Sequence, residues 1–460
     1  MESIILSIYI LLATFIGFNI LRLITFGGRN FHFPENLAIS FGLGVGFISL
    51  QMLLYHFLKI KFDILAIIIP WAILPLINNL SFIKSKFHPE DLRKPSQPKE
   101  AKFNILNFCL GLGIIFEITY AFFRALIKPI ESYDAVAIYA IKSKIFFLAK
   151  SIPAEFLSTF ANMFPHPDYP LNIPLFQSFI YLALNSLNDQ LVKIIFPLYF
   201  LAVLAMLYYA IRRYASATYA LVFTFALATI PQFNAYAANA YLDLPLAYYA
   251  FVSAVFLFEW LRDRKSFAPL ILSAVMAGLA GWTKNEGLLY CMVSILSMLV
   301  FFIFNFDNMK WRDAVGMVIY AVIMFLILAP WVYIRMRYHL VNTDIGAISL
   351  NPLRLLKESH KLLPIFYEFQ RQIFGPKKWN IFWIVTLAAF VLNFKNSFTG
   401  MLRYITIFLI LTVSGYIFVY LISPIDINFF LKKTWSRFMV QFLPIAVYWL
   451  AAILRKDAKE

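Results

Sequence analysis

Residues 128–144 read KPIESYDAVAIYAIKSK, and they interrupt a chain that is otherwise dominated by apolar side chains. Glu131 and Asp134 lie three residues apart in this stretch, a spacing that on a helix places both carboxylates on one face. Ionised groups beside a bilayer interior are costly, and they usually lie in a protein-lined, hydrated cavity that has a function. We therefore predict that this stretch forms one wall of an active site at a membrane surface.

The composition of the 460-residue chain explains why a membrane is expected. The chain is 62% hydrophobic and only 14% charged, whereas a soluble domain carries about 25% charged residues. The apolar runs lack the alternation of a lipid-facing β-barrel. The net charge of +16 does not indicate nucleic acid, because no such motif is present and Lys and Arg beside a membrane orient helices and meet anionic headgroups. The predicted fold class is an all-α polytopic membrane protein.

Apolar runs of about 20 residues, the length that crosses a bilayer, recur along the chain. We predict about thirteen transmembrane helices, with juxtamembrane helices in the outer loops. The first run is expected to be retained, because it has no signal-peptidase site. Segment 171–187, which contains Pro174, is expected to lie on the outer face. The predicted spans are 4–26, 36–58, 64–82, 103–127, 190–211, 216–234, 245–261, 267–282, 288–305, 314–334, 379–394, 402–422 and 438–454.

Basic residues in short loops predict the orientation of these spans, because such loops stay in the cytoplasm. Linker 83–102 carries six basic residues and three prolines, which is typical of an exposed cytoplasmic loop. Alternation then places the other short basic turns on the same side and the chemically unusual segments on the outer side. The basic turns are 212–213, 262–265, 310–312, 395 and 455–456, and the outer segments are 128–189, 234–245, 283–287, 335–378 and 423–437.

Three regions are expected along the chain. Residues 1–102 form an N-terminal three-span module with the basic cytoplasmic linker. Residues 103–334 form the transmembrane core, which includes a first outer loop at 128–189. Residues 335–460 contain an outer loop at 335–378 and the C-terminal spans.

Two groups of polar residues lie in the first outer loop. Asp134 and Glu131 are candidates for a general base that takes a proton from an acceptor. The alternative is a solvated helix start, with Glu131 complementing the helix dipole. His166, Asp168 and Tyr169 follow, and the prolines beside them hold the backbone extended.

The next two groups lie in outer turns between spans. Asp243 precedes an apolar run and Pro245 follows it, which is typical of a helix N-cap. A carboxylate at a helix mouth can also bind a divalent metal through oxygen. Lys284 and Glu286 occupy a tight turn at the membrane border, where Lys284 is expected to bind phosphate and Glu286 to join the site. The alternative is a solvated ion pair.

The last group precedes the final predicted span. Arg437 offers a planar fork suited to phosphate, and Lys432 and Lys433 lie just before it. The alternative is a basic anchor that reaches to the membrane interface. Within the chain no Walker loop, dinucleotide-binding motif or zinc-ligand spacing is found.

In sequence order, these motifs resemble the integral-membrane GT-C superfamily of glycosyltransferases, in particular its protein O-mannosyltransferase and aminoarabinose-transferase-like branch. The resemblance extends over residues 103–334, with a further basic segment before a late span. The two acidic residues of the first motif are separated rather than adjacent, so which of them is the base stays open. The motifs are Glu131–Asp134, His166–Pro170, Ala240–Pro245, Thr283–Gly287 and Arg437.

The resemblance implies inverting transfer of a sugar from a polyprenyl- or dolichyl-phosphate donor to a glycan, lipid or protein acceptor on the outer side. Asp134 would take the acceptor proton, with Glu131 as the other candidate. Lys284, Arg437 or a divalent cation (Mg²⁺ or Mn²⁺) would stabilise the leaving phosphate. The expected location is a bacterial inner (cytoplasmic) membrane, with membrane lipids as further partners. The remaining candidates are Lys432 and Lys433 for the phosphate, and His166, Asp168, Tyr169, Asp243 and Glu286 for substrate or metal.

Two other classes of protein stay open from the sequence. A transporter or lipid flippase could line a path with the same charges, but such proteins often have charges and broken helices at the midplane, whereas these charges cluster in outer turns. A purely structural membrane partner would tolerate neutralisation of all the outer carboxylates. Movement of labelled sugar from a lipid donor to an acceptor separates an enzyme from both.

Overall fold

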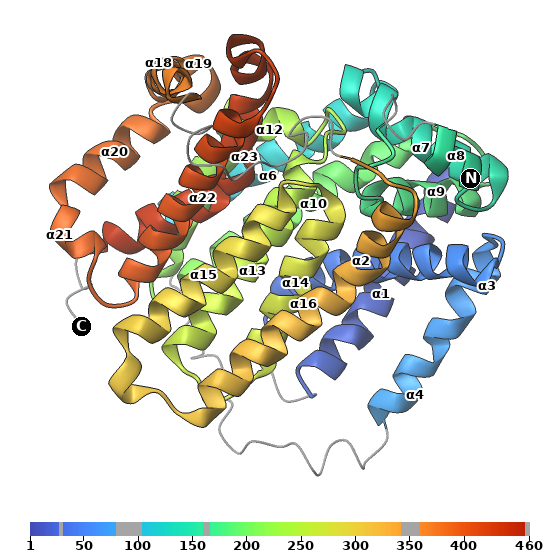
Figure 1. Ribbon diagram of the computed structural model, residues 1–460, viewed down its shortest axis with the longest axis horizontal. Coiled ribbons are helices and arrows are strands. Elements are labelled where there is room, and N and C mark those ends of the chain that lie inside the picture. The colour runs from blue at the N-terminus through green and yellow to red at the C-terminus, as the bar shows by residue number, and fades with distance from the viewer. Residues whose placement is uncertain (27–30, 80–103, 160–165, 342–357, 456–460) are drawn as a thin grey trace.

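The computed structural model describes residues 1–26, 31–79, 104–159, 166–341 and 358–455. Every regular element in these residues is a helix, so the predicted all-α class is confirmed. The long helices run side by side as one slanted bundle (Figure 1). The predicted basic linker 83–102, the last residues of the chain and part of the predicted loop 335–378 lie outside the described residues.

Nine helices among the described residues are long and apolar enough to cross a membrane, which confirms a multi-pass membrane protein. The total of about thirteen spans stays a prediction. The nine are α1 (Glu2–Ile24), α2 (Phe33–Leu58), α6 (Ile105–Leu126), η3 (Leu191–Ile194) continued by α10 (Ile195–Arg212), α13 (Asp243–Arg262), α15 (Gly287–Phe304), α16 (Trp311–Arg337), α22 (Leu402–Ile422) and α23 (Ile427–Ile453).

The other four predicted spans are shorter apolar helices. Proline interrupts two of them, because it removes a backbone donor and clashes with the preceding turn. Pro70 lies in a 3₁₀ turn that splits the first, and Pro231 starts the short helix that follows the second. The helices are α3 (Ile64–Ile68), η1 (Ile69–Ala72) and α4 (Ile73–Asn79); α11 (Ala217–Ala228) and α12 (Pro231–Tyr236); α14 (Ala268–Thr283); and α20 (Phe382–Leu392).

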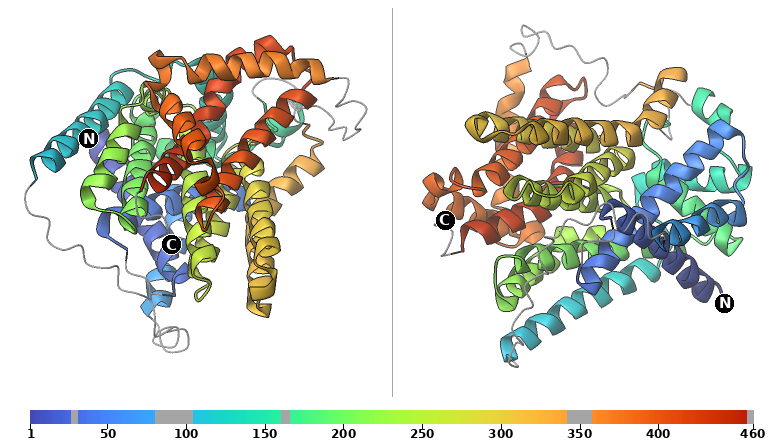
Figure 2. Two further views of the ribbon diagram at one scale, coloured as in Figure 1. Left: turned by 90° about the vertical axis from the view of Figure 1, so that its left-hand side faces the viewer. Right: turned by 90° about the horizontal axis from the view of Figure 1, so that it is seen from below.

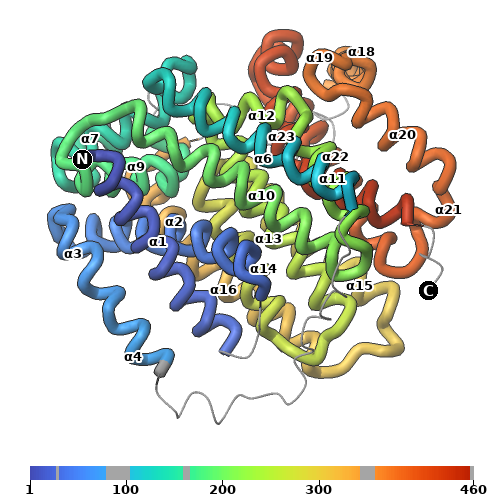
Figure 3. Tube along the Cα trace, turned by 180° about the vertical axis from the view of Figure 1, so that it is seen from behind, coloured from blue at the N-terminus to red at the C-terminus, as the bar shows by residue number. Residues whose placement is uncertain are grey.

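One long helix lies at the edge of the bundle, and short helices complete the described part of the chain. Helix α6 lies on the outside of the bundle (Figures 2 and 3), and only 6% of its most apolar stretch is buried, so it faces lipid. The remaining elements are η2 (Ala135–Ala140), α7 (Ile141–Ala149), α8 (Ala154–Thr159), α9 (Asn172–Leu184), η4 (Phe306–Asn308), η5 (Glu358–Lys361), α18 (Leu362–Ile373), α19 (Pro376–Trp379) and α21 (Phe394–Ser397).

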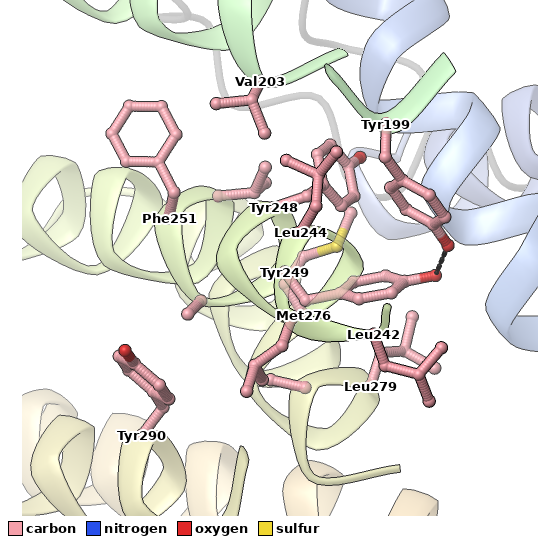
Figure 4. Close-up of a cluster of buried hydrophobic side chains, with 14 of the residues drawn as sticks. Tyr199, Val203, Leu242, Leu244, Tyr248, Tyr249, Phe251, Met276, Leu279 and Tyr290 are labelled. Carbon is pink, nitrogen blue, oxygen red and sulfur yellow. Dashed lines mark hydrogen bonds between the residues drawn. The ribbon is translucent and has the colours of Figure 1, made fainter. Parts of the chain in front are cut away.

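Helix α13 lies at the centre of the bundle. Almost all of its side chains are buried, and it packs against α14, α23 and α10. A helix that is apolar all round is stable only when it is surrounded by protein or lipid. The Tyr249 and Tyr199 hydroxyls lie 3.0 Å apart (Figure 4), and the Tyr248 hydroxyl donates to the carbonyl of Ala38 at 2.7 Å. These bonds satisfy buried phenols and fix α13 against α2 and α10.

Helix α9 corrects the prediction for segment 171–187. The segment was expected to lie as a surface helix on the outer face, but α9 is buried between other helices and packs against α7, α2 and α1. Its location on the outer side stays a prediction. The amide of Asn172 accepts from the Ser49 hydroxyl at 2.7 Å and donates to the Thr283 hydroxyl at 2.8 Å. The side chains of this short helix are mostly apolar on every face, which is the pattern of a buried helix rather than an interfacial one.

The N-terminal helices are packed into the rest of the bundle. Helices α1 and α2 approach each other closely, because a Cβ at Gly17 would lie 1.8 Å from the Ser40 carbonyl oxygen and one at Gly44 would lie 1.9 Å from that of Ala13. Helix α2 also packs against α9 and α10. The predicted division of the chain into three regions stays a prediction.

Candidate active site

Asp243, the first residue of α13, is completely buried. Its side chain does not cap the helix, so the N-cap interpretation is wrong. Instead, Oδ1 accepts from Lys284 Nζ at 2.9 Å and from Gln441 Nε2 at 2.6 Å, while Oδ2 accepts from Arg437 Nε at 3.2 Å. A buried carboxylate is tolerated when cations and hydrogen bonds satisfy it. Asp243 is therefore the fixed centre of a polar cluster.

Arg437 contacts both Asp243 and Asp134, although Asp134 lies 303 residues before Arg437 in the chain. Its Nη1 donates to Asp134 Oδ2 at 2.5 Å, and its Nη2 lies 3.2 Å from Asp243 Oδ2. The guanidinium carbon lies 4.8 Å from the centre of the Tyr241 ring, within cation–π range. The rigid, planar donor fork of arginine allows one side chain to hold both carboxylates.

Lys284 lies just after α14 and is only 4% exposed. Its ammonium group contacts Asp243 Oδ1 at 2.9 Å and Glu286 Oε1 at 2.6 Å. The turn around it is closely packed, because a Cβ at Gly287 would lie 2.0 Å from the Ala280 carbonyl oxygen. Lys284 and Glu286 therefore form an ion pair, but its lysine is buried, unlike the solvated pair that was the alternative interpretation. Lys284 also links Glu286 to Asp243.

We call these five residues, Asp134, Asp243, Lys284, Glu286 and Arg437, the ion cluster. Its three carboxylates and two cations carry a net charge of −1 when all are ionised. Asp243 is buried, whereas the side chains of Asp134 and Glu286 are 25% and 23% exposed. The cluster is therefore closed on the side of α13 and accessible on the side of Asp134 and Glu286.

Glu131 is not brought into the ion cluster. It precedes the helix that starts near Asp134, so the two carboxylates do not share a helix face, contrary to the prediction. Its side chain is 60% exposed and lies 3.3 Å from Lys128 Nζ. Asp134 instead leads directly into η2, a π-helical turn, and such turns are frequent at functional sites. Of the two candidate bases, Asp134 alone contacts the cluster.

His166, Asp168 and Tyr169 form a neighbouring group around Lys142. The buried Lys142 ammonium donates to the His166 carbonyl at 2.6 Å and lies 5.5 Å from the centre of the Tyr169 ring. His166 Nδ1 lies 3.8 Å from Asp168 Oδ1. Burial lowers the pKa of Lys142 to about 7, and the nearby charge of Asp168 opposes that shift. Lys142 therefore holds the His166–Pro170 turn against α7.

Lys432 and Lys433 do not contact the ion cluster. Asp426 caps α23 by accepting from the Phe429 backbone N–H at 2.9 Å, so the helix begins at Ile427 and the predicted loop 423–437 is mostly helical. Lys433 lies over the Phe429 ring, and both lysines are exposed. Lys432 lines an open groove of about 300 Å³ between α18 and α23.

Two residues near the ion cluster were not predicted from the sequence. Gln441 lies within α23, where its Nε2 binds Asp243 and its Oε1 accepts from the Tyr416 hydroxyl at 2.5 Å. Tyr139, in η2, is buried, and its hydroxyl has no hydrogen-bond partner among the described residues. A signal for Gln441 was available, because a polar side chain inside an apolar span usually has a specific partner. Nothing in the sequence distinguished Tyr139 from other core tyrosines.

The predicted metal ligands are not arranged for a divalent cation. Asp243 and Glu286 both contact the Lys284 ammonium group, which lies where a shared cation would bind. Among the described residues no group of three His, Cys, Asp or Glu side chains could hold a metal ion.

Comparison with protein families adds a finding that does not depend on this geometry. Residues 168–334 match the sequence model of the dolichyl-phosphate-mannose-protein mannosyltransferase family. The matched segment contains Asp243, Lys284 and Glu286, whereas Asp134 and Arg437 lie outside it. No characterised protein and no solved structure matched the chain. The match confirms the resemblance predicted from the motifs and, together with the apolar helices, supports a multi-pass membrane glycosyltransferase of the GT-C type.

Proposed function

We propose that the chain transfers a sugar from a polyprenyl- or dolichyl-phosphate donor to a hydroxyl group of a glycan, lipid or protein acceptor. The observation that supports this function is the ion cluster itself. Asp134, Asp243, Lys284 and Arg437 lie far apart in the chain yet contact one another at the start of α13. A general base and two phosphate-binding cations are the groups that such a transfer needs.

The reaction we propose is a single displacement with inversion. The acceptor oxygen attacks the anomeric carbon while the bond from that carbon to the phosphate oxygen breaks. Asp134 takes the proton of the acceptor hydroxyl, and the lipid phosphate leaves with the electron pair of the broken bond. Arg437 and Lys284 stabilise the negative charge that develops on the phosphate. Asp243 orients both cations, because it contacts each of them.

The position of the cluster suits a lipid-linked donor. The site lies at the end of an apolar bundle, so an acyl or prenyl tail can stay in hydrocarbon while its phosphate reaches the cluster. We place this end on the periplasmic side of a bacterial inner membrane. The opposite end collects basic turns, among them Arg213, Arg264 and Arg312, and basic turns favour the cytoplasm.

The test is sugar transfer by the purified full chain in detergent. Polyprenyl phosphates carrying different radiolabelled sugars are supplied with candidate acceptors. We expect label to move to an acceptor, and Asp134→Asn to slow that transfer by at least about 100-fold, the usual contribution of a general base. Glu155→Gln, an exposed carboxylate on α8, controls for charge removal. An Asp134→Asn protein that folds and transfers at the wild-type rate contradicts the base assignment, and label that never leaves the lipid contradicts the function.

A further inference from the structure

The charge of the ion cluster poses a problem for a phosphate ligand. Arg437 and Lys284 each contact two carboxylates, so both cations are already neutralised. A phosphodiester carries one further negative charge, and adding it to a cluster of net charge −1 is unfavourable. Binding of the donor therefore requires one carboxylate to give up its cation.

The contacts indicate which carboxylate loses its cation when the phosphate binds. Asp243 is fully buried and accepts from three side chains, so removing it would leave buried cations unpaired. Glu286 lies in the closely packed turn before α15. Asp134 is about as exposed as Glu286, at 25% against 23%, but no such packed turn is seen around it, and Arg437 is the only cation that it contacts among the described residues. Of these contacts, the hydrogen bond from Arg437 Nη1 to Asp134 is therefore the one that a ligand can replace with the smallest loss of free energy.

Tyr139 supplies a second donor at this position. Its side chain is 1% exposed, and an unpaired buried hydroxyl costs about 1–3 kcal/mol. A π-helix bonds residues five apart, which brings Tyr139 closer to the face of Asp134 than an α-helix would. Burial raises the pKa of Tyr139, and the charges of Arg437, Asp243, Glu286 and Asp134 all act on its ionisation. The hydroxyl therefore stays protonated and lies near the ion cluster.

We propose that the phosphodiester of the lipid donor replaces Asp134 on Arg437 Nη1, accepts a hydrogen bond from Tyr139, and thereby frees Asp134 to act as the base. The inference rests on the proposed function and adds an order of events to it. Without donor, Arg437 Nη1 donates to Asp134 Oδ2, so this carboxylate is held by the guanidinium group. With donor bound, the carboxylate is released beside the sugar that the acceptor attacks.

The test measures binding rather than turnover. Dihexyl phosphate, a phosphodiester with one negative charge, is titrated into the detergent-purified full chain, and neutral trihexyl phosphate reports adsorption to the micelle. We expect Asp134→Asn to bind dihexyl phosphate about tenfold more tightly than wild type, because the competing carboxylate is gone. We expect Tyr139→Phe to bind it about tenfold more weakly, since one hydrogen bond is lost.

Matched variants separate these effects from those of removing any exposed carboxylate or any buried hydroxyl. Glu155→Gln removes an exposed carboxylate elsewhere, and Tyr214→Phe removes another buried hydroxyl that has no partner among the described residues; neither should change binding. Arg437→Lys removes the planar pair of guanidinium donors. In this background, Asp134→Asn should no longer increase the affinity for dihexyl phosphate. Equal or weaker binding by Asp134→Asn overturns the exchange, and wild-type binding by Tyr139→Phe overturns the role of the hydroxyl. Wild-type protein that transfers no sugar overturns the proposed function instead, whatever the binding results.

Discussion

The two ends of α13 both carry ion pairs, but the pairs are connected differently. At the C-terminal end, Arg213 contacts Glu35 and Glu259, while Arg264 pairs separately with Asp313 at 2.6 Å. Asp313 also caps its own helix by accepting from the Lys310 backbone N–H. These pairs tie neighbouring helices together and close their ends, which is a structural task.

At the N-terminal end of α13, the ion pairs form one continuous network. Each cation bridges two carboxylates, and Asp243 accepts from three side chains, those of Lys284 after α14 and of Arg437 and Gln441 on α23. Asp134 and Glu286 at its edges remain partly exposed. Exposure does not separate the two ends, because Glu259 is 29% exposed. The comparison teaches that connectivity, rather than exposure or the number of charges, distinguishes a candidate active site from structural ion pairs.

The largest predicted effect is that of Asp243→Asn. Loss of the shared carboxylate leaves two cations without their common partner, so we expect sugar transfer to fall at least about 1,000-fold and stability to fall by about 3 kcal/mol. Glu259→Gln, at the other end of α13, should keep transfer within about threefold of wild type. Transfer rates and denaturation midpoints of the two purified proteins measure both effects.

Equal effects of the two substitutions on transfer would break the comparison between the ends. A loss confined to stability in Asp243→Asn would do the same, because it would reduce the ion cluster to another structural ion pair.

Arg213→Gln tests the structural end directly. The substitution leaves Glu35, which is 4% exposed, without its cation. We expect a stability loss of about 3 kcal/mol, with unchanged transfer per folded molecule. The measurement combines thermal unfolding with transfer rates that are divided by the folded fraction, which gel filtration provides. A selective loss of turnover in the folded fraction would contradict the assignment.

Lys142 gives a pH prediction. Its pKa in the folded chain is about 7, against 10.5 for an unperturbed lysine. Between these values the unfolded chain binds more protons, so stability should rise with pH. From pH 7 to 9 we expect wild type to gain about 2 kcal/mol relative to Lys142→Met. Unfolding midpoints of both proteins across this range provide the measurement, and parallel curves would contradict the buried, titrating amine.

The smallest effect is expected for Lys432→Gln combined with Lys433→Gln. Both lysines are exposed and lie outside the ion cluster, so they act on an anionic donor only through screened, long-range attraction. We expect a two- to threefold loss in kcat/KM, which about 0.5 M salt should remove. A loss comparable to that of Asp243→Asn would extend the phosphate site to the start of α23.

Hydropathy predicted most of the fold because burial in lipid imposes a long apolar run on each span. It could not predict where a run is divided, since Pro70 and Pro231 act through backbone geometry. It also placed segment 171–187 at the surface, because periodicity does not separate a short buried helix from an interfacial one. The start of α23 was missed because Lys432 and Lys433 resemble a loop in composition.

The candidate site was predicted in part for a related reason. Asp134, Asp243, Lys284 and Arg437 stood out because charges beside apolar runs are rare, and the structure brings all four together. Glu131 carried the same signal but points to solvent, which depends on where the helix starts. Gln441 carried a signal that was not used, because a polar side chain inside an apolar span usually has a specific partner. The contacts of Lys142 and Tyr139 depend on tertiary packing, and no local pattern encodes those.

The most direct test of the account is a structure of the chain with a bound polyprenyl-phosphate sugar. We predict the phosphorus atom within about 4 Å of the Arg437 guanidinium and the Lys284 ammonium, with the Asp134 carboxylate released from Arg437 and facing the anomeric carbon. A phosphate bound at the Arg213 and Glu259 end of α13, or bound away from Arg437 with the Asp134 pair intact, would contradict it.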